Sequence, residues 1–188
     1  MIVGKNAPKA GIVPAVMLYN PKNAHNVATT VRAASCYGLN QVWFTGNRVH
    51  TELEGQKRIP REERMKGYKD VDIIHYDRPL EQFEGATPVA IEVRPDSEFL
   101  PDFEHPENAV YVFGPEDGSI GAEVLRHCHR FVVIPTRHCL NLATAVTTVL
   151  YDRQLKEYYD GKQELTSPGE WEERGPVLYD RKDLSEAR

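Results

Sequence analysis

Short apolar runs recur along the chain, separated by intervals long enough to hold a helix. Six of these runs are rich in β-branched and aromatic residues and predict strands, at 15–19, 41–45, 71–75, 87–91, 110–113 and 131–134. Because the runs are apolar at nearly every position, both faces of each strand are expected to be buried, as in a parallel sheet. Strands that alternate with helical patterns predict an α/β domain with a mostly parallel sheet and helices on both faces.

The segments between the strands predict three helices. Residues 24–37 carry apolar positions at helical spacing and end before Gly38, the expected C-cap. Residues 119–128 form a second candidate, with Ser119 as its N-cap. The strongest amphipathic pattern runs over 141–159.

The composition is that of an ordinary globular protein, with 40% hydrophobic and 27% charged residues in a chain of 188. No apolar run approaches the length of a membrane span, and the first twenty residues do not have the pattern of a secretory signal. We therefore expect a cytoplasmic protein. The cysteines, an odd number without a CxxC pair, are expected to be reduced.

The formal net charge of −5 argues against a protein that coats nucleic acid indiscriminately, yet it permits a local basic patch. The segment 57–69, KRIPREERMKGYK, holds such a patch and predicts contacts with phosphates. A solvated loop of mixed charge explains the same pattern equally well. Residues 161–188, rich in charge, Pro and Gly, are expected to form a tail after a domain at 1–160.

The first stretch that could contain catalytic or binding residues is NPKNAHNVATTVRAASCYG, which follows a strand and opens a helix. Asn23 and Asn26 have the short polar side chains that cap a first helical turn. Arg32 lies two turns into the helix beside apolar positions, where capping does not explain it. Considered alone, Arg32 is better interpreted as an amphipathic residue whose aliphatic carbons pack on the core while its guanidinium group stays in water.

The second stretch, VYVFGPEDGSIG at 110–121, is a strand followed by a glycine-rich turn. Glycines after a strand let the backbone approach a ligand closely, and a following helix N-terminus adds oriented N–H groups. The stretch lacks both the GK[ST] ending of a P-loop and the GxGxxG pattern. A tight turn explains it as well as a ligand site does.

The third stretch, VVIPTRHCLNLATAV, places Cys139 in a short polar loop beside His138. A nucleophilic cysteine needs a base, but residues adjacent in sequence seldom face each other. A zinc site would draw on these two residues with His127, Cys128 and His129, and their spacing matches no standard ligand pattern. We expect Cys128 to have a packing role.

In this order and spacing, the three stretches resemble the motifs of the SpoU (TrmH) class of SPOUT RNA methyltransferases. The resemblance covers roughly residues 14–155. The residues that carry it are Asn23, Asn26, Arg32 and Gly38, then Phe113, Gly114, Pro115, Glu116 and Gly118, then Ile134, Pro135, Cys139, Leu140, Asn141 and Ala145. Three motifs in register favour a functional role for Arg32.

The resemblance implies a fold that the periodicity does not predict. In it, the C-terminal segment of the parallel α/β sheet is threaded through a loop as a deep trefoil knot, a rare exception to the rule against threading. The resemblance further implies an S-adenosylmethionine pocket made by three loops, and a homodimer. No metal is expected, because no set of ligands has a standard spacing. The expected cofactor-binding residues are Ile91, Glu92, Gly114, Ile134, Cys139, Leu140 and Ala145.

The implied activity is methyl transfer to a ribose 2′-hydroxyl of RNA. The resemblance implies Arg32, Asn26, Glu116 and Asn141 as catalytic residues, with Arg32 of one subunit near the cofactor of the other. Because arginine is effectively always protonated, we expect Arg32 to stabilise the developing alkoxide instead of acting as a base. Glu116 is expected to pair with Arg32 and fix its guanidinium plane.

The short chain resembles the minimal, tRNA-modifying type of the class, and its predicted target is the anticodon wobble position. There are two alternatives: a ribosomal RNA 2′-O-methyltransferase, and an RNA-binding protein that keeps the fold without catalysing methyl transfer. The expected RNA-binding residues are Asn23, Lys57, Arg58, Arg61 and Arg64.

Cys139 departs from the class, whose members commonly carry serine at this position. Cysteine keeps the size of serine but is a weaker hydrogen-bond donor and acceptor. A contact with RNA that depends on the hydroxyl would therefore be weakened, whereas a role in backbone geometry would be preserved.

Overall fold

The computed structural model describes residues 2–3, 10–49 and 70–163. The chain divides into two compact units, residues 1–155 and residues 156–188. The first unit carries the sheet and all of the predicted catalytic and cofactor-binding residues. The predicted domain boundary after residue 160 stays a prediction, and most of the predicted tail lies outside the described residues.

Eight strands, all paired in parallel, form one sheet in the described part of the chain. They are β1 (Ile2–Val3), β2 (Ala15–Leu18), β3 (Gln41–Phe44), β4 (Asp72–His75), β5 (Thr87–Ile91), β6 (Glu98–Phe99), β7 (Ala109–Phe113) and β8 (Arg130–Val133). Their order across the sheet is β1-β4-β3-β2-β7-β5-β8-β6. The carboxyl ends of neighbouring strands therefore meet at one edge, where ligands usually bind in such sheets.

All six predicted strands are confirmed, each to within one residue at either end. Every residue of β2, β3 and β7 is buried, which confirms that the central strands are covered on both faces. The two-residue strands β1 and β6 were not predicted, because so short a strand has no periodic pattern.

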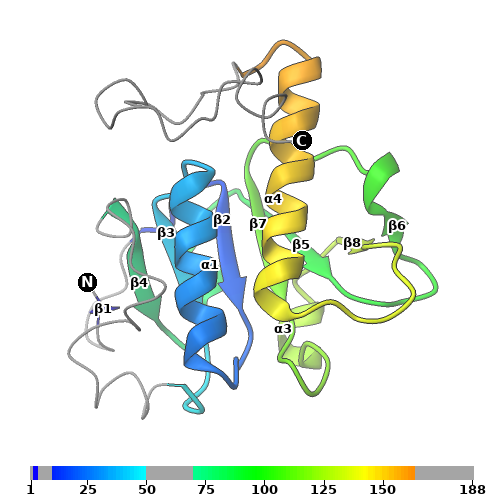
Figure 1. Ribbon diagram of the computed structural model, residues 1–188. Helices are drawn as coiled ribbons and strands as arrows, with labels where there is room; N and C mark the ends of the chain where they lie inside the picture. Colours follow the sequence, from blue (N-terminus) through cyan, green and yellow to red (C-terminus); the bar gives the residue numbers. More distant parts are fainter. Residues whose placement is uncertain (1, 4–9, 50–69, 164–188) are drawn as a thin grey trace, which may run out of the picture. The chain divides into compact units, whose positions relative to one another are not determined.

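Helices cover both faces of the sheet, as predicted. Figure 1 shows α1 (Ala24–Cys36) and α4 (Leu142–Tyr159) in front of the strands, where their apolar residues share one core with the sheet. The opposite face packs a second core against η3 (Pro79–Gln82) and α3 (Ala122–Leu125). A further short helix, η4 (Leu100–Asp102), lies between β6 and β7 in the chain.

The ends of α1 follow from local chemistry. The Asn23 side chain accepts a hydrogen bond from the His25 backbone nitrogen at 2.8 Å, which makes Asn23 the N-cap. At the other end Gly38 adopts a φ of 74°, and the Leu39 nitrogen donates to the Ala34 carbonyl at 2.9 Å. Glycine tolerates this left-handed backbone, so the predicted stop at Gly38 is confirmed.

The predicted helix over 119–128 is wrong in extent. The α-helix α3 has only four residues, and its N-cap is Gly121, not Ser119. Ile120 is 3% exposed, and its backbone nitrogen donates to the Glu92 carboxylate at 3.0 Å. These two contacts with distant parts of the chain hold residue 120 outside the helix.

The helix α4 is 18 residues long and begins directly after Asn141, as predicted. Its inward positions include Val146, Val149 and Leu150, all buried in the core that it shares with α1. Among the residues that the structure describes, no helix is both long enough and apolar enough to cross a membrane. The cytoplasmic location stays a prediction.

A buried network of hydrogen bonds connects α4 to β7. Arg153, 7% exposed, donates to the Pro106 carbonyl at 2.7 Å and to the Tyr111 hydroxyl at 3.0 Å. The ring of His105 joins the same hydroxyl, at 2.7 Å, to the Asp152 carboxylate, at 2.8 Å. Side chains of α4 are therefore hydrogen-bonded to β7 and to the segment that precedes it.

Candidate active site

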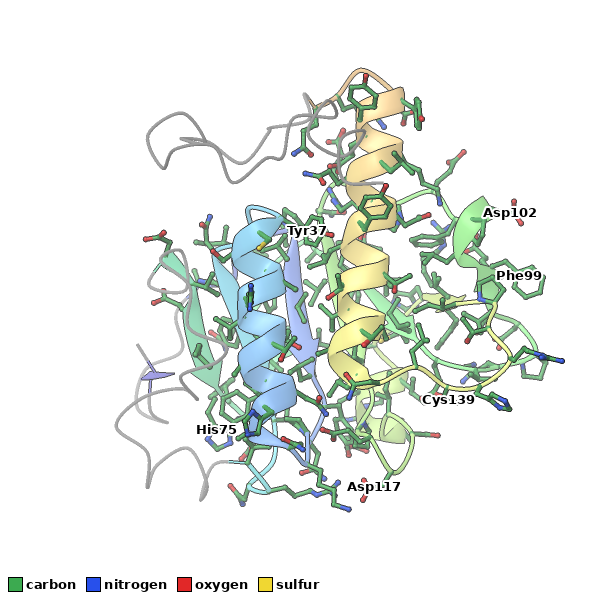
Figure 2. All side chains as sticks on the ribbon, in the orientation of Figure 1. Tyr37, His75, Phe99, Asp102, Asp117 and Cys139 are labelled. Carbon is green, nitrogen blue, oxygen red and sulfur yellow. The ribbon has the colours of Figure 1, made fainter. Side chains whose placement is uncertain are left out.

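A cavity of about 690 Å³ opens at the carboxyl ends of β5, β7 and β8. Three loops line it: the residues after Ile91, the residues 113–118 and the long connection from β8 to α4. Figure 2 shows Cys139 in that last connection, which runs from the sheet edge to the start of α4. The cavity lies where a parallel sheet is expected to bind its ligand.

The structure brings all seven predicted cofactor-binding residues to this one cavity. They are Ile91, Glu92, Gly114, Ile134, Cys139, Leu140 and Ala145. The first and the last are 54 positions apart in the sequence, and the seven meet because β5, β7 and β8 are neighbours in the sheet. Their role toward a cofactor stays a prediction.

Glu92 ties two of the lining loops together. Its backbone nitrogen donates to the Val132 carbonyl at 3.0 Å, and its carboxylate accepts from the Ile120 nitrogen at 3.0 Å. A Cβ atom at Gly114 would lie 3.4 Å from the same Ile120 nitrogen. A Cβ atom at Gly114 would therefore be in ordinary van der Waals contact with Ile120 of the same loop.

Three of the predicted catalytic residues form a chain of hydrogen bonds beside the cavity. Asn141 caps α4, because its side-chain oxygen accepts from the Ala143 nitrogen at 3.0 Å, and its side-chain nitrogen donates to Asn26 at 3.0 Å. The side-chain nitrogen of Asn26 donates in turn to the Glu116 carboxylate at 2.6 Å. The first turns of α1 and α4 are thus joined to the loop after β7.

The Glu116 carboxylate is held by three donors. Besides Asn26, the backbone nitrogens of Lys22 and Asn23 donate to it at 2.7 Å and 3.1 Å. Partial burial raises the pKa of Glu116, but these hydrogen bonds outweigh that effect and leave the pKa below its usual value. Glu116 is therefore an ionised acceptor at neutral pH.

An ion pair that the sequence did not predict lies next to Glu116. Both terminal guanidinium nitrogens of Arg48 donate to the Asp117 carboxylate at 2.8 Å, and the Lys22 ammonium donates to it at 3.2 Å. The hydrogen bonds from Arg48 and then Lys22 hold the pKa of Asp117 well below its usual range. Asp117 is charged throughout the pH range in which the protein would be studied.

The motifs that shape this cavity match one family. The model of the SpoU rRNA methylase family matches residues 14–151. The chain belongs to the SpoU rRNA methylase family. The match covers both ends of the hydrogen-bonded chain from Asn141 to Glu116 and all three lining loops.

Solved SpoU structures share the fold. A TrmH/SpoU tRNA modifying enzyme from A. aeolicus has a TM-score of 0.66 at 22% identity, over 91% of this chain and 83% of its own. AviRb from Streptomyces viridochromogenes, in complex with AdoMet, has a TM-score of 0.67 at 17% identity, over 83% and 63%. A structure concerned with the 2-OH methylation of C/U34 on tRNA has a TM-score of 0.64 at 24% identity, over 77% and 90%. Curated proteins gave no match by sequence.

Arg32 of this SpoU chain stands apart from the other predicted catalytic residues. Its side chain is exposed on α1, between the buried residues Val31 and Ala33. Six residues along an α-helix correspond to about 9 Å of rise and a rotation that leaves two side chains about 120° apart. Arg32 and Asn26 therefore point in different directions, and the expected pair between Arg32 and Glu116 does not form within the chain.

The predicted RNA contacts are largely untested. Lys57, Arg58, Arg61 and Arg64 lie outside the described residues. Asn23 is described, and its side-chain oxygen caps α1. Contact of these five residues with RNA stays a prediction.

The cysteines of this SpoU chain differ in environment. Cys36 and Cys139 are exposed, whereas Cys128 is buried in the core behind the sheet, which confirms its packing role. Burial raises the pKa of Cys128 to about 11. Within the described ranges, no cluster of three or more His, Cys, Asp or Glu residues is arranged to hold a metal ion.

A second cavity, of about 470 Å³, lies on the face of the sheet that packs against η3 and α3. Its lining includes Met17, Phe83 and Val124 on its apolar side and Arg126 and His129 among its polar residues. None of the predicted site residues that the structure describes lines it. Residues of the second and third motifs thus converge on the first cavity, and Asn26 of the first motif is joined to it through its hydrogen bond to Glu116.

Proposed function

We propose that this protein is an S-adenosylmethionine-dependent methyltransferase that modifies a ribose 2′-hydroxyl of RNA. One observation carries the proposal: all seven residues expected to hold the cofactor line one cavity at the carboxyl edge of the sheet. The hydrogen-bonded chain of Asn141, Asn26 and Glu116 borders the same loops. Family membership supports the same class of reaction.

The cavity is compatible with the cofactor in size and chemistry. Its volume falls within the range of about 300–1,000 Å³ that is usual for small-molecule sites. Ile91, Ile134 and Leu140 offer apolar surface for an adenosine, and the carboxylates of Glu92 and Glu116 suit a ligand with cationic groups. When bound, S-adenosylmethionine supplies an electrophilic methyl group.

In this proposal the polar residues orient the RNA. Asn141 and Asn26 fix the geometry between the two helices, and ionised Glu116 keeps Asn26 in one orientation. Arg32 places a permanent positive charge near the ribose and stabilises the alkoxide that develops as the hydroxyl proton passes to a phosphate of the RNA or to water. Most of the catalytic effect then comes from positioning and charge stabilisation.

The direction of Arg32 supports a homodimer in which it serves the site of its partner subunit. Arg32 does not line the cavity of its own chain and is exposed on α1. A second copy that packed along this part of α1 would bring Arg32 to another cavity. Glu116 would then be available to pair with the Arg32 of the partner.

We further infer that the C-terminal segment forms the knot expected from the resemblance. The strand β8 inserts between β5 and β6, and the connection that follows it lines the same cavity as the loops after β5 and β7. A threaded segment would bring these three loops to one cavity in this way.

The RNA is proposed to be tRNA, with the anticodon wobble position as the target. Similarity in fold to a tRNA modifying enzyme and to a structure concerned with C/U34 methylation supports this choice. A ribosomal RNA target is the second candidate, because an rRNA methyltransferase from Sinorhizobium meliloti has a TM-score of 0.59 at 18% identity. A protein that keeps the fold without turnover is the third.

Two measurements test the proposed function. Calorimetry with S-adenosylmethionine should show binding, and its absence would remove the enzyme hypothesis. Labelled cofactor should then donate its methyl group to total RNA from cells that lack the protein, and mapping of the modified nucleotide separates tRNA from ribosomal RNA. Cofactor binding without transfer to any RNA would support the non-catalytic alternative.

Cys139 tests whether the departure from the family's usual serine affects activity. Cys139→Ser should retain or raise methyl transfer, because serine restores the stronger hydrogen-bonding group. Cys139→Ala should lose less than about tenfold, since the residue is exposed at the cavity wall and alanine preserves the backbone. A loss of several orders of magnitude in both variants, measured as initial rates, would restore the nucleophile hypothesis.

A further inference from the structure

We propose that Arg48 is a positioning residue of this site, which acts through Asp117 to fix the loop after β7. The inference rests on the proposed function, because it gives Arg48 a part in the same reaction. Arg48 follows β3 and belongs to none of the three motifs, whereas Asp117 lies within the second motif, between Glu116 and Gly118.

The loop after β7 has an inner and an outer side. Gly114, Pro115, Glu116 and Gly118 line the cavity, and Asp117 does not. Figure 2 shows Asp117 at the edge of the sheet where the strands end. Its carboxylate is bound there by Arg48 through two hydrogen bonds of 2.8 Å, in a geometry that fixes direction as well as distance.

Two adjacent carboxylates thus anchor this loop to two different elements. Glu116 is bonded to the start of α1 through Asn26 and two backbone nitrogens. Asp117 is bonded to Arg48 beyond β3, and β2 lies between β3 and β7 in the sheet. The Arg48 pair therefore spans the end of β2 and ties the loop after β7 to the segment after β3.

The pair is better suited to placing a loop than to stabilising the fold. The side chains of Arg48 and Asp117 are 32% and 45% exposed, and ion pairs so exposed contribute little to stability. A displacement of Glu116 by about 1 Å would instead be costly to catalysis, because Asn26 and Asn141 are connected to it. Loss of the pair should therefore change the rate more than the stability.

The test compares Arg48→Ala, Asp117→Asn and the double variant with the wild-type protein. Each single variant should lower kcat by about tenfold, with an unchanged KM for RNA and an unchanged unfolding midpoint. The double variant should lose no more than Asp117→Asn alone, because Asp117→Asn already weakens the pair with Arg48 as well as the pair with Lys22 at 3.2 Å. Arg48→Lys should recover part of the rate. Arg78→Ala is the matched control, since it removes an exposed arginine paired with Glu81 at 3.2 Å, and it should leave the rate unchanged.

A second measurement needs neither cofactor nor RNA. Hydrogen exchange in peptides that cover 20–24 and 114–120 should be faster in Arg48→Ala and Asp117→Asn than in wild type or Arg78→Ala. If the wild-type protein shows no cofactor binding and no transfer, the proposed function fails, and exchange still decides whether the pair orders the loop. Unchanged exchange would overturn the proposal. A raised KM for RNA in Arg48→Ala alone would also overturn it and mark Arg48 as an RNA contact.

Discussion

Arg32→Ala is expected to lower the rate of methyl transfer to RNA by about a hundredfold to a thousandfold, the usual effect of removing one preorganised charge-stabilising group. Affinity for S-adenosylmethionine should stay near its wild-type value, because Arg32 is proposed to act on the ribose and is not among the seven residues expected to hold the cofactor. Single-turnover transfer of a labelled methyl group measures the first quantity, and calorimetry measures the second. An equal loss of both would contradict the assigned role.

Two further variants serve as comparisons. Arg32→Lys keeps the charge without the planar guanidinium group, and its rate of methyl transfer should fall between those of wild type and Arg32→Ala. Arg126→Ala removes an exposed arginine just after α3 and should be as active as wild type.

Mixed dimers then test whether Arg32 serves the site of its own chain or that of the partner. Inactive Arg32→Ala subunits, refolded together with inactive Asn141→Ala subunits, should regain activity if Arg32 serves the partner's site. No recovery would place Arg32 in the site of its own chain.

Local pattern predicted the strands well because β2, β3 and β7 are buried on both faces and read as continuous apolar runs. It failed where distant contacts decide the local structure. Residues 119–128 have a helical pattern, yet the buried side chain of Ile120 and its hydrogen bond to Glu92, 28 positions away, delay the helix. The edge strand β6 exists through pairing with β8, which leaves no signal in two residues.

Only the site residues that belong to the three motifs could be predicted from the sequence. Asn141 and Asn26 are 115 positions apart, and nothing in either local sequence predicts their hydrogen bond. The resemblance to a family assigned both residues to one catalytic site, and the parallel sheet explains why they lie close together. Arg48 and Asp117 are 69 positions apart and Arg48 belongs to no motif, so their ion pair emerged only from the structure. The direction of Arg32 likewise required α1 to be placed on the sheet.

Arg153→Met is expected to lower the free energy of unfolding by about 3 kcal/mol, the cost of removing a charged donor from buried partners. Methionine keeps much of the apolar stem of Arg153 but cannot donate hydrogen bonds to the Pro106 carbonyl or the Tyr111 hydroxyl. Because Arg153 is 7% exposed, water does not easily replace the lost donor. Urea unfolding followed by circular dichroism measures the change.

Arg78→Met is the control for this substitution, because it removes the same side chain from an exposed ion pair, for which a cost of about 0–1 kcal/mol is usual. An Arg153→Met protein as stable as this control would show that the network under α4 does not hold the helix. The expected loss would have a consequence at the cavity, since α4 begins directly after Asn141 and β7 ends before Gly114. The same residues that attach α4 to β7 then set the distance between the loop after β7 and the start of α4, both of which line the cavity. Arg153→Met should therefore bind S-adenosylmethionine more weakly even under conditions in which it remains folded.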